Sequence, residues 1–156
     1  IALERTKVNI VEFLSQIIEE YIPVFEENEI EVVKKFVDEK CMVEIDAGKM
    51  VRVFENLFSN AIKYSFKPGN VIVSSYENNG FVNIVIKNRG ENIPQEKVER
   101  LFDRFYRVDE ARNSNTKGSG LGLAISKNII ELHNGSIWAE CDGNDVSFFI
   151  KLKVIR

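Results

Sequence analysis

Residues 55–64, ENLFSNAIKY, carry four polar side chains whose types and spacing suit the binding of a charged ligand. Asn56, Asn60, Lys63 and Tyr64 lie at i, i+4, i+7 and i+8, so on a helix they share one face. Asparagine is a mediocre helix former, and two of them among apolar residues need an explanation. A carboxamide oxygen suits Mg²⁺, a lysine meets phosphate charge, and a tyrosine offers a flat surface to a base. The spacing therefore indicates a coordination face; the alternative is a solvated polar face or amides that bind loop backbone.

A second candidate is the glycine-rich stretch KGSGLGL at residues 117–123. It is not a Walker A loop, because Gly-x4-Gly-Lys-Ser/Thr occurs nowhere in the chain. Nor is it a dinucleotide fingerprint, because its glycines are spaced by two and no strand precedes them. A glycine-rich loop that opens a helix presents free N–H groups and a positive dipole end to an anion. The alternative is a flexible hinge at a helix start.

The stretch IKNRGENIP, residues 86–94, follows an apolar, strand-like run and carries two asparagines and a glycine before a proline. Glycine at such a junction lets the backbone approach a ligand closely. Three interpretations are open: an ordinary polar turn, an intact ligand loop, or a ligand loop that has lost its key residue.

A third polar segment, LFDRFYR at residues 101–107, contains two arginines. Its aromatic residues suit local core or lid packing rather than contact with a cofactor. Arg104 and Arg107 are surface charges in one interpretation. In the other, a guanidinium near phosphates stabilises charge that develops on a transferring phosphoryl group.

Apolar periodicity predicts the elements that must position these residues. Helices are expected at residues 10–25, 47–64, 96–102 and 120–133. Asp46 is the expected N-cap of the second helix. Strands are expected at residues 30–37, 41–45, 71–76, 81–87, 136–141 and 146–154, with an Asn-Gly hairpin turn in ENNG. Strands joined by tight turns and mixed with helices predict an α+β sandwich with helices on one face.

The composition predicts one soluble, globular domain, since 156 residues with 44% hydrophobic and 29% charged residues form a proper core. A net charge of -3 argues against a general nucleic-acid binder, and no apolar run approaches membrane-spanning length. Cys41 and Cys141 fit a reduced cytosolic protein better than a disulfide scaffold, although one pair stays open. Because the chain begins at Ile rather than Met, we expect a fragment of a longer protein.

The order of these motifs resembles one family over essentially the whole chain. NLFSNAIKYS, then the strand ending in Asn-x-Gly, then LFDRFYRVD and GSGLGLAIS are similar to the catalytic, ATP-binding domain of sensor histidine kinases. That domain belongs to the superfamily of gyrase, the ninety-kilodalton heat-shock chaperones and the mismatch-repair ATPase. The resemblance implies a Bergerat-type fold: a two-layer sandwich with a mixed, mainly antiparallel sheet of about five strands, covered on one face by about three helices.

The resemblance also implies roles for the polar helix face, with ATP between this helix and a mobile lid at about residues 107–119. Asn60 would be the Mg²⁺ ligand, and Asn56 would support the phosphates or the metal. Lys63 would bind phosphate oxygens, and Tyr64 would pack against adenine or ribose.

Other parts of the site are implied in the same way. Arg107 matches the family arginine that reaches the γ-phosphate, with Arg104 as a helper. The lid hinge and phosphate-binding helix start would be formed by Lys117, Gly118, Gly120, Leu121, Gly122 and Leu123. The adenine loop would contribute Asn88, Gly90, Asn92 and Ile93.

One position separates the branches of the superfamily. ATP-hydrolysing relatives place a glutamate four positions before the metal asparagine, where it activates water; here that residue is Asn56. Glu55 is adjacent but about 100° round the helix, so it should point elsewhere. Without a positioned base, slow hydrolysis and transfer to a nucleophile are expected, which favours a kinase over an ATP-driven clamp.

The acceptor is expected outside this chain. His133 is the single histidine, and its place at the end of a helix predicts a structural capping role. The resemblance implies a phosphoacceptor histidine on a dimerisation domain that this fragment lacks, with a response regulator as downstream partner. It also implies a monomeric, cytoplasmic domain of a parent protein anchored in the membrane.

Two departures from the family pattern fall at the base end of the site. The usual Asp-x-Gly-x-Gly loop reads Asn88-Arg-Gly-Glu-Asn92 here, and Val146 stands where a Thr is common. Asn-x-Gly followed by Ile-Pro is similar to the vancomycin-resistance sensor kinases. Asn88 keeps an oxygen for the adenine amino group but loses the charge. A nucleotide-sensing or pseudokinase module with weakened adenine recognition is therefore the second hypothesis.

Overall fold

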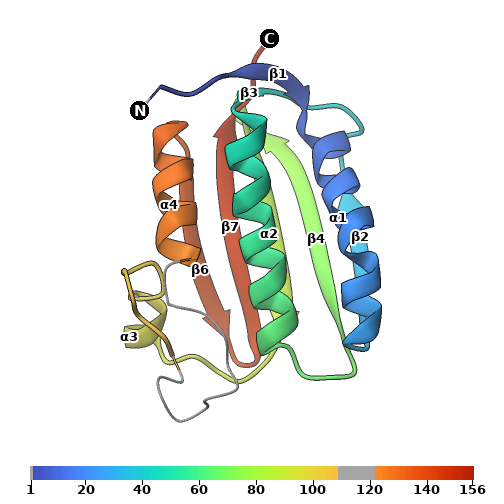
Figure 1. Ribbon diagram of the computed structural model, residues 1–156, viewed down its shortest axis with the longest axis vertical. Helices are drawn as coiled ribbons and strands as arrows, with labels where there is room; N and C mark the ends of the chain where they lie inside the picture. The colour runs from blue at the N-terminus through green and yellow to red at the C-terminus, as the bar shows by residue number, and fades with distance from the viewer. Residues whose placement is uncertain (1, 109–121) are drawn as a thin grey trace.

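The protein folds into two layers, with helices on one face of a five-stranded sheet. The structure, a computed structural model, describes residues 2–108 and 122–156. Figure 1 shows α1, α2 and α4 side by side over the sheet, with the short α3 at the lower edge. The predicted α+β sandwich is confirmed.

The helices within the described residues are α1 Ile10–Glu27, α2 Ala47–Tyr64, α3 Gln95–Val98 and α4 Gly122–Leu132. The two long helices have side-chain N-caps, as local chemistry requires. The Asn9 side chain accepts a hydrogen bond from Val11 N at 3.2 Å, and Asp46 Oδ1 accepts one from Lys49 N at 3.1 Å. The predicted start of α2 at Asp46 is thus confirmed. The helix predicted at residues 96–102 is shorter, because only α3 forms there.

The main sheet has the strand order β2-β4-β5-β7-β6. Its strands are β2 Ile30–Phe36, β4 Gly69–Asn78, β5 Phe81–Arg89, β6 Ser136–Asp142 and β7 Asp145–Lys153. β2 runs parallel to β4, and every other pair is antiparallel. The β4–β5 hairpin predicted from ENNG is confirmed, with Asn79 at φ 54° and Gly80 at φ 82°, as a primed two-residue turn requires.

A second, two-stranded sheet was not predicted. β1 Thr6–Asn9 pairs antiparallel with β3 Met42–Ile45, above the start of α2. The β1 sequence, TKVN, is four residues long and has one aliphatic side chain, so periodicity carries no strand signal there.

The core lies between the helices and the inner face of the sheet. Along β5, buried Val82, Ile84, Ile86 and Asn88 alternate with half-exposed residues, as a strand with one covered face requires. Between α1 and α2, Phe58 is fully buried, with ring centroids of Tyr21, Phe25 and Phe54 at 5.9, 6.0 and 6.4 Å from its own. Aromatic packing of this kind joins the two helices into one layer.

The face of the sheet away from the helices carries the chain's single tryptophan. Trp138 of β6 stacks on Phe149 of β7, with centroids 5.2 Å apart and planes at 6°. Its Nε1–H donates to Glu140 Oε2 at 3.2 Å. Both cysteines are free thiols in the structure, as the sequence favoured.

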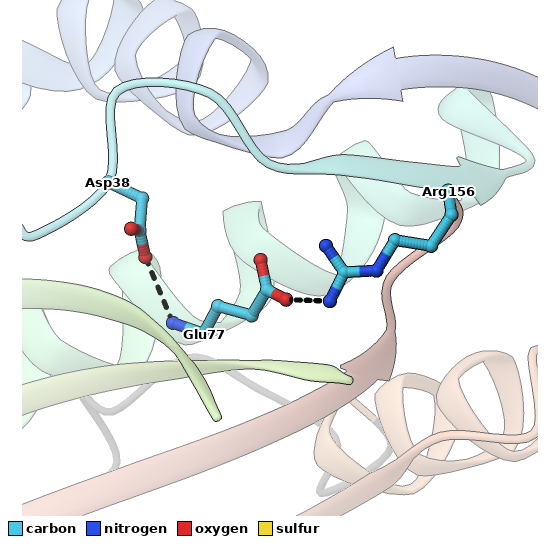
Figure 2. A network of polar contacts seen from close by, with 3 residues as sticks. All are labelled: Asp38, Glu77 and Arg156. Atoms are coloured by element: carbon cyan, nitrogen blue, oxygen red, sulfur yellow. Dashed lines mark hydrogen bonds and ion pairs between the residues drawn. The ribbon is translucent and has the colours of Figure 1, made fainter. Parts of the chain in front are cut away.

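Polar contacts join the carboxyl end of the chain to the turn after β2. Figure 2 shows Asp38 Oδ2 accepting a hydrogen bond from Glu77 N at 3.0 Å, and the Glu77 carboxylate paired with the Arg156 guanidinium. Ile155 N also donates to Met42 O at 2.9 Å, which ties the large sheet to the small one. None of the helices in residues 2–108 and 122–156 is long and apolar enough to cross a membrane.

Candidate functional site

A cavity of about 460 Å³ is lined by residues of α2, the loop after β5 and the start of α4. Its size lies in the range of sites that hold small molecules and cofactors. The cavity is lined by Asn56, Ser59, Asn60, Lys63, Tyr64, Ser65, Phe66, Asn88, Glu91, Asn92, Ile93, Leu101, Tyr106, Arg107, Val108, Gly122, Leu123, Val146 and Phe148.

The polar face of α2 reaches this cavity as its spacing predicted: Asn56, Asn60, Lys63 and Tyr64 all line it. Lys63 Nζ lies 5.5 Å from the centroid of the Tyr64 ring, and Tyr64 is 39% exposed. All four side chains thus border one hollow, and their role as a coordination face stays a prediction.

Asn56 makes the kind of contact that the alternative interpretation allowed, an amide bound to backbone. Its Nδ2 donates to Gly122 O at 3.1 Å and to Ser126 Oγ at 3.2 Å, and Ser126 is fully buried. Both amide hydrogens are thus used to hold the first turns of α4 against α2. The Asn56 side chain therefore positions the helix start that forms the opposite wall.

Glu55 faces away from the cavity, as predicted from its place on the helix. It is not among the lining residues. Burial of the Tyr21 hydroxyl and, second, the charge of Glu55 raise the pKa of Tyr21, which places this carboxylate on the α1 side of α2. The carboxylate that does line the cavity, Glu91, belongs to the loop after β5. α2 therefore presents no carboxylate base to the cavity.

The structure gives a reason for glycine at position 90 besides the expected close approach of a ligand. It is not among the lining residues, and a Cβ at this position would lie 2.2 Å from Tyr64 O. Gly90 pairs with Ser65 in an isolated β-bridge, so the loop runs against the last turn of α2. Close approach to the Tyr64 carbonyl therefore requires glycine at position 90, and contact of Gly90 with a ligand stays a prediction.

The loop after β5 is held to the β6–β7 turn by amides and a thiol. Gly90 N donates to Asn144 O at 2.9 Å, and Asn144 Nδ2 donates back to Gly90 O at 2.9 Å. Asn92 Nδ2 donates to Gly143 O at 2.6 Å, and Ile93 N donates to Cys141 Sγ at 3.3 Å. Asn92 and Ile93 both line the cavity, as predicted.

Asn88 lies at the inner, apolar end of the cavity. It is 4% exposed and sits opposite Val146 in the β5–β7 register. Its side-chain nitrogen Nδ2 is buried and has no hydrogen-bond partner in the described structure. Val146 and Phe148 line the same end. A buried polar atom without a partner needs an explanation, and an ordered water or a ligand in the adjoining cavity would supply one.

The two arginines of LFDRFYR are separated in the structure. Arg107 lines the cavity, whereas Arg104 does not. Phe105 between them has φ 65° and is 65% exposed, and the Arg104 guanidinium lies 5.8 Å from its ring centroid. The backbone turn at Phe105 therefore sends the two guanidinium groups different ways.

Of the residues predicted in the glycine-rich stretch, the structure describes the last two. Gly122 and Leu123, the first residues of α4, line the cavity. Lys117, Gly118, Gly120 and Leu121, and the predicted lid from residue 109 onward, lie outside the described residues.

Sequence reasoning missed several lining residues: Ser59, Ser65, Phe66, Glu91, Leu101, Tyr106, Val108 and Phe148. Ser59 lies three positions after Asn56, so helical spacing could have found it. Phe148 could not be found this way, because strand pairing, not local sequence, brings it to the cavity.

The cavity suits a magnesium nucleotide. No cluster of three or more His, Cys, Asp or Glu side chains that could hold a metal occurs in the described part of the chain. A carboxamide such as Asn60 suits a cation that keeps waters and arrives with phosphate oxygens, which is how Mg²⁺ is bound beside nucleotides. The lysine, the arginine and the start of α4 suit phosphate, and the apolar end with its unpaired amide suits a base.

His133 lies at the other end of α4. Its Nδ1 contacts Ile129 O at 2.8 Å, and its Nε2 accepts a hydrogen bond from Asp46 N at 3.0 Å. The side chain thus ties the end of α4 to the start of α2, in agreement with the predicted structural role.

Comparison with known proteins decides the family. Residues 45–154 match the family described as "Histidine kinase-, DNA gyrase B-, and HSP90-like ATPase". The chain belongs to this family. It is 40% identical over 154 residues to the sensor histidine kinase WalK of Bacillus subtilis. The aligned region covers 96% of the chain and 25% of WalK. It is 46% identical over 123 residues to WalK of Staphylococcus haemolyticus, covering 77% of the chain and 20% of that protein.

Solved structures agree with this family assignment. The catalytic domain of the histidine kinase ThkA, in a nucleotide-free form, has a TM-score of 0.85 and 29% identity, covering 97% of the chain and 98% of that domain. ThkA in complex with the response regulator TrrA has a TM-score of 0.82 and 26% identity, covering 97% of the chain and 42% of that one. The chain spans about a quarter or less of the curated relatives it matches. The closer likeness to vancomycin-resistance sensors stays a prediction.

Proposed function

We propose that this domain binds Mg²⁺-ATP and transfers the γ-phosphoryl group to a histidine of a two-component sensor kinase, on a dimerisation domain outside this chain. The observation that carries the proposal is the cavity wall in which Asn60 and Lys63 of α2 meet Arg107 and the start of α4. These groups are a metal ligand, two phosphate-binding cations and a helix N-terminus, which phosphoryl transfer requires.

Each group has a task in this proposal. Mg²⁺, when bound, neutralises phosphate charge and orients the transferring group. Asn60 supplies an oxygen ligand, while Lys63 and Arg107 hold phosphate oxygens, and Arg107 stabilises charge that develops during transfer. Tyr64 packs against adenine or ribose. Arg104, Lys117, Gly118, Gly120, Gly122, Leu121 and Leu123 keep the roles that the resemblance implies.

Transfer rather than hydrolysis is favoured by the absence of a base on α2. The Asn56 amide donates its two hydrogen bonds to Gly122 O and Ser126 Oγ, and the Glu55 side chain faces α1. A carboxylate at position 56 would have activated water. This arrangement argues against an ATP-driven clamp.

A second candidate is a nucleotide-sensing or pseudokinase module, favoured by one observation: Asn88 replaces the charged acceptor usual at the base end. The positions of Asn60, Lys63 and Arg107 at the cavity favour the kinase. In the kinase proposal the domain is monomeric and cytoplasmic, belongs to a membrane-anchored parent, and works upstream of a response regulator. The ThkA–TrrA complex is a relative of known structure that carries such a partner.

Calorimetry with Mg²⁺-ATP and Mg²⁺-ADP tests the binding half of this proposal, with Asn60→Ala as the critical variant. We expect millimolar or tighter binding by the native chain and a loss of about tenfold or more in Asn60→Ala, because the metal loses a protein ligand. No detectable nucleotide binding at millimolar concentration would contradict the proposal.

Transfer is tested by mixing the domain with its cognate histidine hairpin and following phosphohistidine. His133→Ala is the matched control, because His133 lies at the far end of α4, and it should leave transfer intact. Binding without transfer to the cognate hairpin would favour the pseudokinase. Loss of transfer in a folded His133→Ala variant would overturn the structural role of His133.

A further inference from the structure

Three asparagine amides, two of them lining the cavity, lie in or beside the loop after β5, and Asn88 alone among the three has an unpaired side-chain nitrogen. Asn92 Nδ2 is bound to Gly143 O, and Asn144 Nδ2 is bound to Gly90 O. Asn88 Nδ2 is buried with no partner among the described residues. Asn92 and Asn144 fasten the loop, so the capacity to recognise a ligand edge rests with Asn88.

Two neighbours of Asn88 offer its amide no hydrogen-bonding side chain. Opposite it in the sheet is Val146, whose side chain carries no hydrogen-bonding group. A Cβ at residue 90 would lie 3.3 Å from Asn88 Nδ2. Glycine has no Cβ, so only the backbone of residue 90 can contact this nitrogen. Asn88 Nδ2 makes no hydrogen bond in the described structure, so a half-turn of the amide breaks no bond at that atom.

The two orientations read two different purine edges. Adenine offers a donor at its 6-amino group and an acceptor at N1, which match an amide oxygen and an amide N–H. Hypoxanthine and guanine offer an acceptor at O6 and a donor at N1, which match the same amide turned over. An ionised carboxylate, by contrast, can only accept hydrogen bonds. It would therefore leave O6 of a 6-oxopurine facing another acceptor.

We propose that Asn88 makes the site accept 6-oxopurine as well as 6-aminopurine nucleoside triphosphates. The proposal rests on the proposed function, since it places the base at the apolar end lined by Ile93, Val146 and Phe148. Asn88 is a specificity-determining residue in this view: its amide, in place of a carboxylate, removes the element that rejects a 6-oxo group. Such rejection arises when a buried polar group is left unpaired by the wrong ligand.

Calorimetry with Mg²⁺-ATP and Mg²⁺-ITP tests the inference, because the two bases differ only at the 6-position and N1. For the native chain we expect the two dissociation constants to agree within about tenfold. Asn88→Asp, measured at about pH 8 where the carboxylate is ionised, should bind ATP at least as well and widen the ratio to about 100-fold or more.

Asn88→Leu is the second variant, because it removes both the donor and the acceptor at similar volume. If the amide reads both edges, this change should weaken ATP and ITP by similar factors. Urea unfolding shows whether each variant is folded. Should Asn88→Asp fail to fold, Asn88→Leu and the native ratio decide the question.

The outcomes separate this inference from the proposed function. Native binding of ATP with ITP weaker by about 100-fold or more would overturn the inference and leave the function standing. An unchanged ratio in Asn88→Asp, or loss of ATP affinity alone in Asn88→Leu, would also overturn it. Absence of binding to either nucleotide would overturn both.

Discussion

At the scale of single residues, the asparagines of this domain divide the work of the site between fastening and recognition. Asn56 fastens α4 to α2, and Asn92 and Asn144 fasten the loop after β5. Asn60 and Asn88 also line the cavity, and in the proposed function Asn60 meets the metal and Asn88 meets the base. Residue type alone does not distinguish these tasks, because the amide group serves them all.

Gly90 shows how a single missing side chain sets the shape of the site. We expect Gly90→Ala to lower the free energy of unfolding by about 1–3 kcal/mol, since its Cβ would lie 2.2 Å from the backbone oxygen of Tyr64. The matched control is Gly48→Ala inside α2, where the nearest atom would be Asp46 Oδ1 at 3.7 Å. That control should stabilise by up to about 1 kcal/mol, as alanine does in a helix. Equal effects in urea unfolding would contradict this account.

Residue-level prediction succeeded where spacing along one helix decides the outcome. Asn56, Asn60, Lys63 and Tyr64 were expected on one face and lie on it. It did not foresee that Gly90 packs against a carbonyl 26 positions earlier in the chain. No local signal marks such a contact.

At the scale of elements, α2 is held at both ends by residues distant in sequence. Its start is capped by Asp46, whose backbone N–H also donates to His133 Nε2 at the end of α4. Its end meets the loop after β5 through the Ser65–Gly90 bridge. The helix that carries the ligand face is therefore fixed in place before any ligand binds.

Asp46 makes part of this anchoring depend on pH. Hydrogen bonds from Glu4 N and Lys49 N lower the pKa of Asp46 below its ordinary value of 3.8. A lowered carboxyl pKa contributes stability above the unfolded-state value, and this contribution is lost as pH falls through the folded-state pKa. We expect Asp46→Ala to lower the urea midpoint near neutral pH, with a difference from the native chain that shrinks in acid.

Asp46→Asn is the matched control for this prediction, because asparagine also caps helices but carries no charge. It should keep most of the native midpoint and lose the pH-dependent part. A constant difference between Asp46→Ala and the native chain across the acid range would contradict the assignment to the carboxylate.

Element boundaries followed from caps and turns where these signals were strong, as at Asp46 and at Asn79-Gly80. β1 was missed because its strand is made by pairing with β3 and not by its own composition. Phe105 adopts a positive φ that the sequence does not predict. It lies between Arg104, which is not a lining residue, and Arg107, which lines the cavity. Non-local pairing decides the case of β1.

At the scale of the whole molecule, buried aromatic packing outweighs the surface ion pairs. Phe58→Ala should lower the free energy of unfolding by about 3–5 kcal/mol, because Phe58 is fully buried among the rings that join α1 to α2. Glu77→Gln, which breaks the pair with Arg156 shown in Figure 2, should cost under about 1 kcal/mol, since the Arg156 side chain is 76% exposed. Urea unfolding measures both, and a larger loss in Glu77→Gln would contradict this ranking.

The two-layer architecture was predictable because motif order resembles a family with that fold. The parallel pairing of β2 with β4 was not, because α2 and β3 lie between them in the chain. Nor does the sequence show that the C-terminal residues tie the large sheet to the small one.

The stacked pair on the outer face of the sheet gives this chain a built-in optical probe. Trp138 is the sole tryptophan, rests on Phe149 and is not among the residues that line the cavity. Its emission therefore reports whether β6 and β7 remain paired, from the face of the sheet opposite the cavity-lining Val146 and Phe148. Unfolding of any variant of this domain can be followed at that one fluorophore while the ligand site is filled.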